Sequence, residues 1–124
     1  MKFSKTHEWA NLEEDGTVTV GVSDHAQHAL GDIVFVELPE LGEHITAGKE
    51  CGVFESAKSA SDLYSPISGE VIVVNDEVFA APDLLNKDPQ GAGWLFKVRP
   101  VNLKEIDLLL DTKVYEQYLV ESAH

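Results

Sequence analysis

One lysine stands apart among the residues that could do chemistry. Lys58 is the only long side chain in the run from Ser56 to Ser61, and strand-like segments flank this run. A lysine at the tip of a tight hairpin, with no bulky neighbour, is open to the active site of another protein from several directions. This setting suits covalent modification of the ε-amine. On the local sequence alone, however, an ordinary exposed turn lysine is the favoured interpretation, since such lysines are common.

The other reactive side chains do not form a catalytic set. The sequence has no Gly-x-Ser-x-Gly turn, which would place a serine nucleophile between a strand and a helix. It also lacks the phosphate-binding Gly-x-x-x-x-Gly-Lys-Ser/Thr pattern, and Gly91 and Gly93 do not lie between a strand and a helix. We therefore expect a protein that is not itself an enzyme.

The sequence also gives little support for a metal site or a reactive thiol. His25 and His28 lie three residues apart beside Asp24, but no second ligand pair stands at a diagnostic spacing. We interpret them as polar residues on a solvated helix and expect no metal. Cys51, the single cysteine, lies in a predicted strand, where a small buried thiol is the usual case. It cannot form an internal disulfide, which favours a reducing, intracellular compartment.

Length and charge exclude several partners. The 124 residues suffice for one domain, and 44% of them are hydrophobic, as in a globular protein. With 22 acidic and 9 basic residues, the formal net charge is -13, which disfavours nucleic acid and anionic membranes. No apolar run approaches the roughly 20 residues of a membrane span, so we expect a soluble protein.

The elements that position Lys58 are predicted to be short strands. Residues 7–12 and 17–22 predict a hairpin, and 33–38 predicts a strand that ends at Pro39. Further strands are predicted at 50–55, 62–64, 69–74 and 94–98. Because no helix is expected between the later strands, from 33–38 onward, the pattern favours an antiparallel barrel or sandwich.

Helices are predicted at two places only. Asp24, followed three residues later by Gln27, has the form of a capping box, and Gly31 provides a stop, so a short helix is expected at 24–30. A second capping pattern begins at Asn102, and apolar residues return at helical spacing to about residue 120. We therefore expect a C-terminal helical segment over about 102–120.

The sequence resembles the H-protein family of the glycine cleavage system. The most specific match is the segment around the lysine, Glu55-Ser56-Ala57-Lys58-Ser59-Ala60-Ser61-Asp62-Leu63-Tyr64-Ser65-Pro66, followed by Gly69. Earlier matches are His7-Glu8-Trp9, the block Gly21 to Gln27, and the block Leu30 to Pro39 followed by Gly42. Later matches, in order, are Asn75, Pro82, Asn86, Pro89, Gly91, Gly93 and Trp94. The resemblance covers nearly the whole chain, from about Phe3 to Leu119.

This resemblance implies a fold and a cofactor. The fold is a barrel-sandwich hybrid of the biotinyl/lipoyl-carrier type, formed by a single domain over 1–124, with the lipoyl hairpin at about 53–66. The cofactor is lipoic acid, joined covalently to Lys58 through an amide that removes the lysine charge. The protein then carries an aminomethyl group but has no catalytic centre of its own.

The resemblance also implies partners and a second site. The partners are the pyridoxal-phosphate glycine decarboxylase (P protein), the tetrahydrofolate-dependent aminomethyltransferase (T protein), dihydrolipoamide dehydrogenase (L protein), and a lipoate ligase or lipoyl/octanoyl transferase. In the family the loaded arm folds into a cleft on the carrier. The family positions that carry over to this cleft are Glu8, His25, Asp62 and Thr6. A carboxylate suits an alkylammonium group through a charge-assisted hydrogen bond.

The sequence departs from the family at a few positions. Gln90 stands where the family commonly has an aromatic residue, which puts a packing or partner contact in doubt. Ala57 and Ser59 replace the more usual Val and Ala beside the lysine but remain small.

Other carriers fit the sequence less well. Biotin carriers bracket their lysine with methionines, and the lipoyl domains of 2-oxoacid dehydrogenases usually have Asp-Lys-Ala at the tip and lack terminal helices. An H-like protein that donates its lipoyl group to 2-oxoacid dehydrogenase complexes needs the same lysine, so this lipoyl relay stays open, as does a regulatory adaptor.

The oligomeric state and the cellular location are also expected. We expect a monomer in a bacterial-type cytoplasm, because no targeting segment precedes the first family block. A mitochondrial matrix protein that has lost a transit peptide is the alternative.

Overall fold

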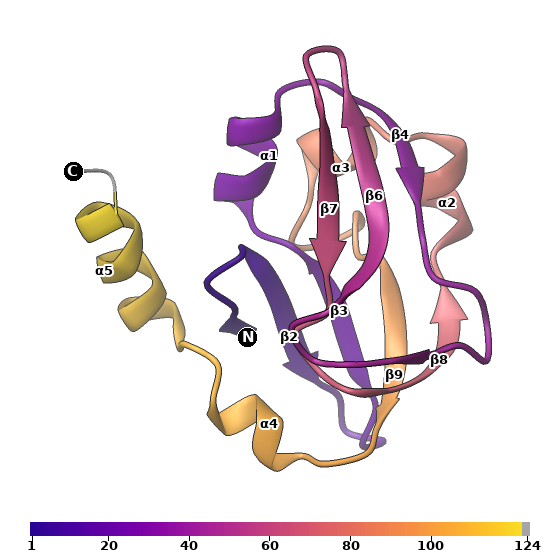
Figure 1. Ribbon diagram of the computed structural model, residues 1–124, viewed down its shortest axis with the longest axis vertical. Coiled ribbons are helices and arrows are strands. Elements are labelled where there is room, and N and C mark those ends of the chain that lie inside the picture. Colours follow the sequence, from indigo (N-terminus) through magenta and orange to yellow (C-terminus); the bar gives the residue numbers. More distant parts are fainter. Residues whose placement is uncertain (123–124) are drawn as a thin grey trace.

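The chain folds into two antiparallel sheets with helices around them (Figure 1). This computed structural model describes residues 1–122. The larger sheet has the order β1-β2-β3-β9-β8-β5, with β1 Lys2–Phe3, β2 Glu8–Leu12, β3 Val18–Val22, β9 Phe96–Pro100, β8 Gly69–Val74 and β5 His44–Ile45. The smaller sheet has the order β4-β6-β7, with β4 Ile33–Glu37, β6 Glu50–Ser56 and β7 Ala60–Tyr64. The expected mostly-β architecture is confirmed, and over the described residues the two sheets do not join into a closed barrel.

The core lies between the two sheets. Val18, Val20 and Val22 of β3 are fully buried, and they face Phe54 and Leu63 of the smaller sheet within one apolar cluster. Burial of each such side chain contributes roughly 1.5–3 kcal/mol to the free energy of unfolding. This cluster fixes the smaller sheet, and therefore the hairpin that carries Lys58, against the body of the protein.

The hairpin of β6 and β7 forms most of the smaller sheet. Its register pairs Val53 with Asp62 and Glu55 with Ala60, and it shifts between Glu50 and Gly52. A side chain at Gly52 would overlap the carbonyl oxygen of Glu37 in β4. The glycine therefore lets β4 and β6 approach closely at this irregularity.

The helix α1, Asp24–Leu30, is confirmed, but its cap differs from the prediction. Ser23 is the N-cap, and its hydroxyl oxygen accepts a hydrogen bond from the Ala26 N–H at 3.2 Å. Gln27 instead donates its amide N–H to the Asp24 side chain at 2.9 Å. Ser23 takes the N-cap position because its side-chain oxygen, just before the helix, reaches a free N–H group of the first turn.

The expectation that no helix separates the later strands was wrong. Two short helices, α2 Asp76–Ala80 and α3 Leu84–Lys87, lie between β8 and β9. Asn75 caps α2 by accepting from the Glu77 N–H at 3.2 Å. Helices of four or five residues are too short to display an apolar period, which is why the sequence pattern missed them. The pattern also missed the two-residue strands β1 and β5.

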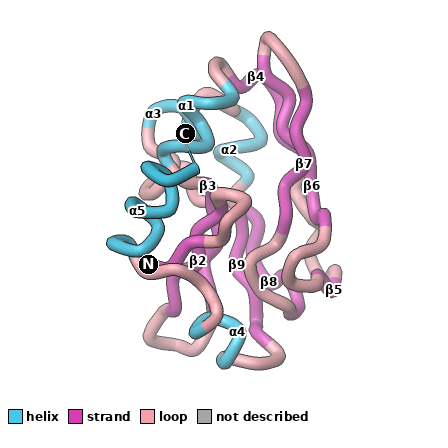
Figure 2. Tube along the Cα trace, turned by 60° about the vertical axis from the view of Figure 1, so that its left-hand side comes forward, coloured by secondary structure: helices cyan, strands magenta, loops and turns pink. Residues whose placement is uncertain are grey.

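The C-terminal segment is helical, but it divides in two. Helix α4 covers only Lys104–Asp107, and α5 covers Thr112–Ser122. Glu105 does not complete the predicted capping box, because its carboxylate accepts from the Ser68 backbone N–H and hydroxyl, each at 2.9 Å. Figures 1 and 2 show α5 standing at the side of the molecule, beside α1 and the N-terminus. Within residues 1–122, no helix is both long and apolar enough to cross a membrane.

Candidate functional site

Lys58 lies at the exposed tip of the β6–β7 hairpin, which projects beyond the rest of the molecule (Figure 1). The turn is held by Ser56, whose hydroxyl oxygen accepts from the backbone N–H groups of Lys58 at 3.3 Å and Ser59 at 3.1 Å. The Ala57 N–H donates to the Asp32 carbonyl at 3.1 Å, which ties the tip to the start of β4. The tip is therefore a fixed turn from which only the lysine side chain extends.

The Lys58 side chain leans toward the end of α1. A Cβ built on Gly31, which follows α1 with a φ of 79°, would lie 3.8 Å from Lys58 Cε and 3.9 Å from Nζ. These distances are ordinary van der Waals contacts, so the glycine is required here by its positive φ and not by crowding. The end of the Lys58 side chain therefore lies beside the C-terminal end of the helix that forms one wall of a nearby cleft.

That cleft has a volume of about 130 Å³ and lies between α1, the start of β2 and the β6–β7 hairpin. Most of its surface is apolar, and several polar side chains also line it. The lining residues are Thr6, His7, Glu8, Val22, Ala26, Ala29, Leu30, Phe54, Ser61 and Asp62. An apolar wall with a few converging polar groups is the usual form of a small-molecule site.

Glu8 is the most unusual residue of the cleft, because it is a carboxyl group with only 3% of its surface exposed. One carboxylate oxygen accepts from the hydroxyls of Ser4, at 2.8 Å, and Thr6, and the other accepts from the Tyr64 N–H at 3.3 Å. Burial raises the pKa of Glu8 to about 7, although these hydrogen bonds act in the opposite direction. Because Tyr64 belongs to β7, this carboxyl group also connects the two sheets.

The free energy of unfolding should therefore depend on the ionisation of Glu8. The unfolded chain ionises at the ordinary pKa of 4.5, whereas the folded protein holds the proton until about 7. As pH rises between these values, only the unfolded state gains the charge, so folding becomes less favourable. Relative to Glu8→Gln, the wild-type free energy of unfolding should fall by on the order of 2–3 kcal/mol from about pH 5 to about pH 8. Denaturant titrations of both proteins across this pH range measure the difference between their free energies of unfolding. A difference that does not change with pH would contradict a raised pKa of the buried Glu8 carboxyl.

The structure brings together three of the four residues expected at the cleft. Thr6, Glu8 and Asp62 line it, while His25 is not among the lining residues. His25 is exposed on α1 and contacts the cleft through His7, with 4.6 Å between the ring centroids. His25 therefore lies next to a residue of the cleft lining, and its role toward a loaded arm stays a prediction.

His7 is the main residue that the sequence pattern missed. It is the only non-glycine residue of 1–122 with a positive φ, 74°, a backbone conformation that costs roughly 1–3 kcal/mol and persists where the surroundings enforce it. Its carbonyl accepts from the Ser23 N–H at 2.9 Å, and its N–H donates to the Ser4 carbonyl at 3.1 Å. Burial, with a smaller contribution from His25, lowers the pKa of His7. The signal in the sequence was its place beside Glu8 in a family block.

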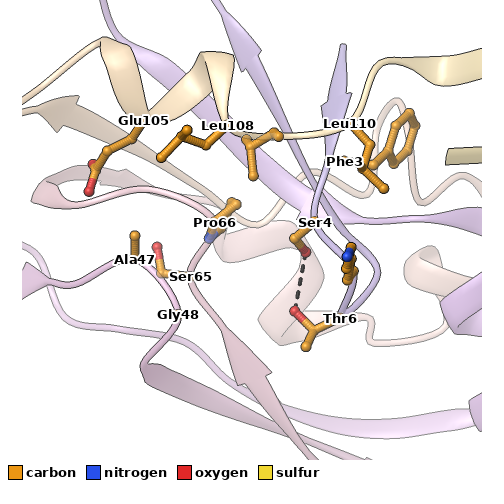
Figure 3. Close-up of a pocket in the computed structure, with 12 residues that line it drawn as sticks. Phe3, Ser4, Thr6, Ala47, Gly48, Ser65, Pro66, Glu105, Leu108 and Leu110 are labelled. Carbon is orange, nitrogen blue, oxygen red and sulfur yellow. Dashed lines mark hydrogen bonds between the residues drawn. The ribbon is translucent and has the colours of Figure 1, made fainter. Parts of the chain in front are cut away.

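A second, larger cavity lies on the other side of the Ser4–Thr6 segment. Its volume is about 350 Å³, and Figure 3 shows Leu108 and Leu110 along one edge, with Ser65 and Pro66 facing them. Ser4 and Thr6 point toward each other here, with 3.2 Å between their hydroxyl oxygens. Thr6 lines both cavities, so the segment is a shared wall.

The remaining candidates have structural contacts. His28 pairs with Asp24 at 3.3 Å on the exposed face of α1, and residues 1–122 contain no cluster of three or more His, Cys, Asp or Glu side chains suited to a metal ion. Burial raises the pKa of the half-buried Cys51 thiol to about 12, so the thiol stays protonated at neutral pH. Gln90 accepts from the Asp24 N–H at 3.0 Å and so supports the first turn of α1.

Known proteins share both this sequence and this fold. A model of the family "Glycine cleavage H-protein" matches residues 1–122. A protein of Neisseria meningitidis serogroup C, named glycine cleavage system H protein, is 55% identical over 115 residues, which are 93% of this chain and 90% of that one. One of the same name from Shewanella sp. strain MR-7 is 52% identical over 121 residues, 98% of this chain and 94% of that one.

A solved structure agrees with the sequence relatives. The crystal structure of a glycine cleavage system H protein from Mycobacterium marinum superposes with a TM-score of 0.86 at 38% identity, covering 99% of this chain and 96% of that one. Identity above half over nearly full length, a matching family model and the same two-sheet fold agree. The chain belongs to the glycine cleavage H-protein family.

Proposed function

We propose that this protein is the lipoyl carrier of a glycine cleavage system, with lipoic acid attached to Lys58. The observation that best supports this proposal is the position of Lys58 at an exposed hairpin tip, with its side chain beside the end of α1, the helix that forms one wall of a cleft with a buried carboxyl group. Membership of the family supports the assignment. The carrier takes an aminomethyl group from the P protein and delivers it to the T protein, and the L protein restores the arm.

The residues present fit a lipoyl arm. The exposed lysine has only small residues beside it, which gives a ligase access, and the cleft offers apolar side chains to a hydrocarbon chain. When bound, the lipoyl group supplies a disulfide that accepts the one-carbon unit and two electrons, and a long tether. The folded protein itself supplies the binding site and the protection from water.

The protein's own part is to hold and protect the cargo between enzymes. Val22, Leu30 and Phe54 exclude water from the cleft. Glu8 and Asp62 present carboxyl oxygens to the alkylammonium group, and the arriving positive charge favours the ionised form of Glu8. A tethered cargo also reaches its next enzyme without dilution into bulk solvent.

The experiment that tests the attachment is intact-mass spectrometry with peptide mapping, after co-expression with a lipoate ligase and lipoic acid. A single lipoyl increment on Lys58 is expected. An unmodified protein, when the same ligase modifies a control lipoyl domain, would overturn the proposal and leave an H-like adaptor.

A second assay separates glycine cleavage from lipoyl relay. The lipoylated protein should support exchange of the glycine carboxyl carbon with labelled bicarbonate in the presence of the P protein. Relay requires the lysine but no carboxyl-lined cleft, so the cleft favours glycine cleavage. A lipoylated protein that fails this exchange and passes its lipoyl group to a 2-oxoacid dehydrogenase domain would establish the relay instead.

A further inference from the structure

One side chain of the C-terminal helix forms hydrogen bonds near the cleft. Tyr115 of α5 is 4% exposed, and its ring stacks on Phe3 with 4.3 Å between centroids and 4° between planes. Its hydroxyl lies 2.7 Å from His7 Nδ1 and 2.8 Å from the Ser23 hydroxyl oxygen. Tyr115 does not line the cleft, but one of these partners, His7, does, and the other, Ser23, caps the helix that supplies part of the lining.

These two contacts control different parts of the cleft. His7 lines the cleft itself and supports His25 through their ring contact. Ser23 is the N-cap of α1, the helix that supplies Ala26, Ala29 and Leu30 to the apolar wall. One hydroxyl therefore contacts both a residue of the cleft lining and the N-cap of the helix that supplies apolar residues to it.

The strained backbone of His7 makes this support necessary. A residue held at a φ of 74° relaxes unless its surroundings prevent it. The carbonyl and N–H of His7 are held by Ser23 and Ser4, and the ring is held by Tyr115. The antiparallel bridge between Phe3 and Leu110 anchors the chain just before α5, so the helix keeps its place.

We infer that Tyr115 is a positioning residue for the cargo cleft, setting His7 and the start of α1 so that water is kept from the loaded arm. This inference rests on the proposed function. The reaction it suppresses is the attack of water on the aminomethyl carbon: the carbon–sulfur and carbon–nitrogen bonds break, formaldehyde and ammonium leave, and the sulfur regains its proton. No electrons are transferred, and the reverse condensation loads the reduced arm.

The test compares Tyr115→Phe with Tyr118→Phe. Phe at 115 retains the ring that stacks on Phe3 and removes only the hydroxyl. Tyr118 is on the same helix, and its ring centroid lies 6.3 Å from that of His7, but its hydroxyl contacts the Lys5 carbonyl at 3.5 Å. Phe at 118 retains the ring, so the matched change removes no hydrogen bond to His7 or Ser23. Both variants should fold, and melting temperatures check this.

Two readouts are needed, one with the cargo and one without. The reduced lipoyl proteins are loaded with formaldehyde and ammonium, and ammonia release is followed. Tyr115→Phe should release ammonia about three- to tenfold faster than wild type, as expected for the loss of one or two buried hydrogen bonds. In the unmodified protein, hydrogen exchange at the Ser23 and Ala26 amides should accelerate by a similar factor, and Tyr118→Phe should match wild type in both assays.

The outcomes separate this inference from the proposed function. Equal ammonia release from Tyr115→Phe and wild type overturns the inference, even if amide exchange changes, because Tyr115 would then serve the fold alone. Equal acceleration by both variants also overturns it. A wild-type protein that retains the cargo no longer than free aminomethylated lipoamide overturns the proposed function of the cleft, and this inference with it.

Discussion

Lys58→Arg should retain the fold and eliminate both lipoylation and glycine–bicarbonate exchange. Arginine keeps the positive charge and the length of the side chain, but its guanidinium does not form the amide that joins lipoic acid to a lysine amine. The turn itself depends on Ser56 and on backbone groups, so it does not need the lysine side chain. We expect exchange activity to fall to the background without carrier, while the melting temperature stays within a few degrees.

The control is Lys49→Arg, a change of the same chemistry at an exposed lysine just before β6. It should be lipoylated and active like wild type. Exchange by Lys58→Arg at the wild-type rate, or a lipoyl increment mapped to another lysine, would refute the attachment site.

Glu8→Gln should shorten the lifetime of the cargo more than any other single change in the cleft wall. Glutamine keeps the size of the side chain and one acceptor oxygen, but it cannot carry the negative charge that pairs with the alkylammonium group. Hydrogen bonds to charged groups contribute about 1.5–3 kcal/mol, so release of ammonia should accelerate by about ten- to a hundredfold. The rate is best compared near pH 8, because the wild-type carboxyl, with a pKa of about 7, is ionised there.

Glu14→Gln is the matched control, since Glu14 is exposed in the turn between β2 and β3. It alters the net charge equally and should leave the lifetime unchanged. If Glu8→Gln releases ammonia as slowly as wild type, the carboxyl does not bind the cargo, and its burial needs another explanation.

The sequence predicted the main elements because their patterns are local. The β2–β3 hairpin, α1, β4, β6 and β8 follow from alternation, turn residues and caps that lie within a few positions of each other. The family resemblance supplied the cleft residues Thr6, Glu8 and Asp62, which are far apart in the sequence and share no local pattern. The sequence alone could identify Lys58 as accessible but could not show that its side chain lies beside Gly31 at the end of α1.

The parts that were missed depend on contacts between distant segments. His7 takes its positive φ from Ser4 and Ser23, and the hydroxyl of Tyr115 reaches it from 108 positions further along the chain. Strand β1 exists because Phe3 pairs with Trp9 on one side and Leu110 on the other, and nothing in two residues of sequence encodes this. Both Ser23 and Asp24 suit the cap position, and Ser23, which occupies it, is also held by the His7 carbonyl and the Tyr115 hydroxyl, which no local pattern encodes.

The hydrogen-bonded hairpin tip has a consequence for the enzymes that would use the proposed lipoyl arm. Because Ser56 ties the backbone of the turn together, an arm on Lys58 would move about the lysine side chain, within a sphere around one point of the surface. Only small residues, Ala57, Ser59, Ala60 and Ser61, accompany the lysine at the tip. A partner must therefore present a narrow entrance that admits this tip, with its reacting atoms no deeper than one arm length. Three enzymes of unrelated chemistry would then share one feature, a tunnel of matching depth.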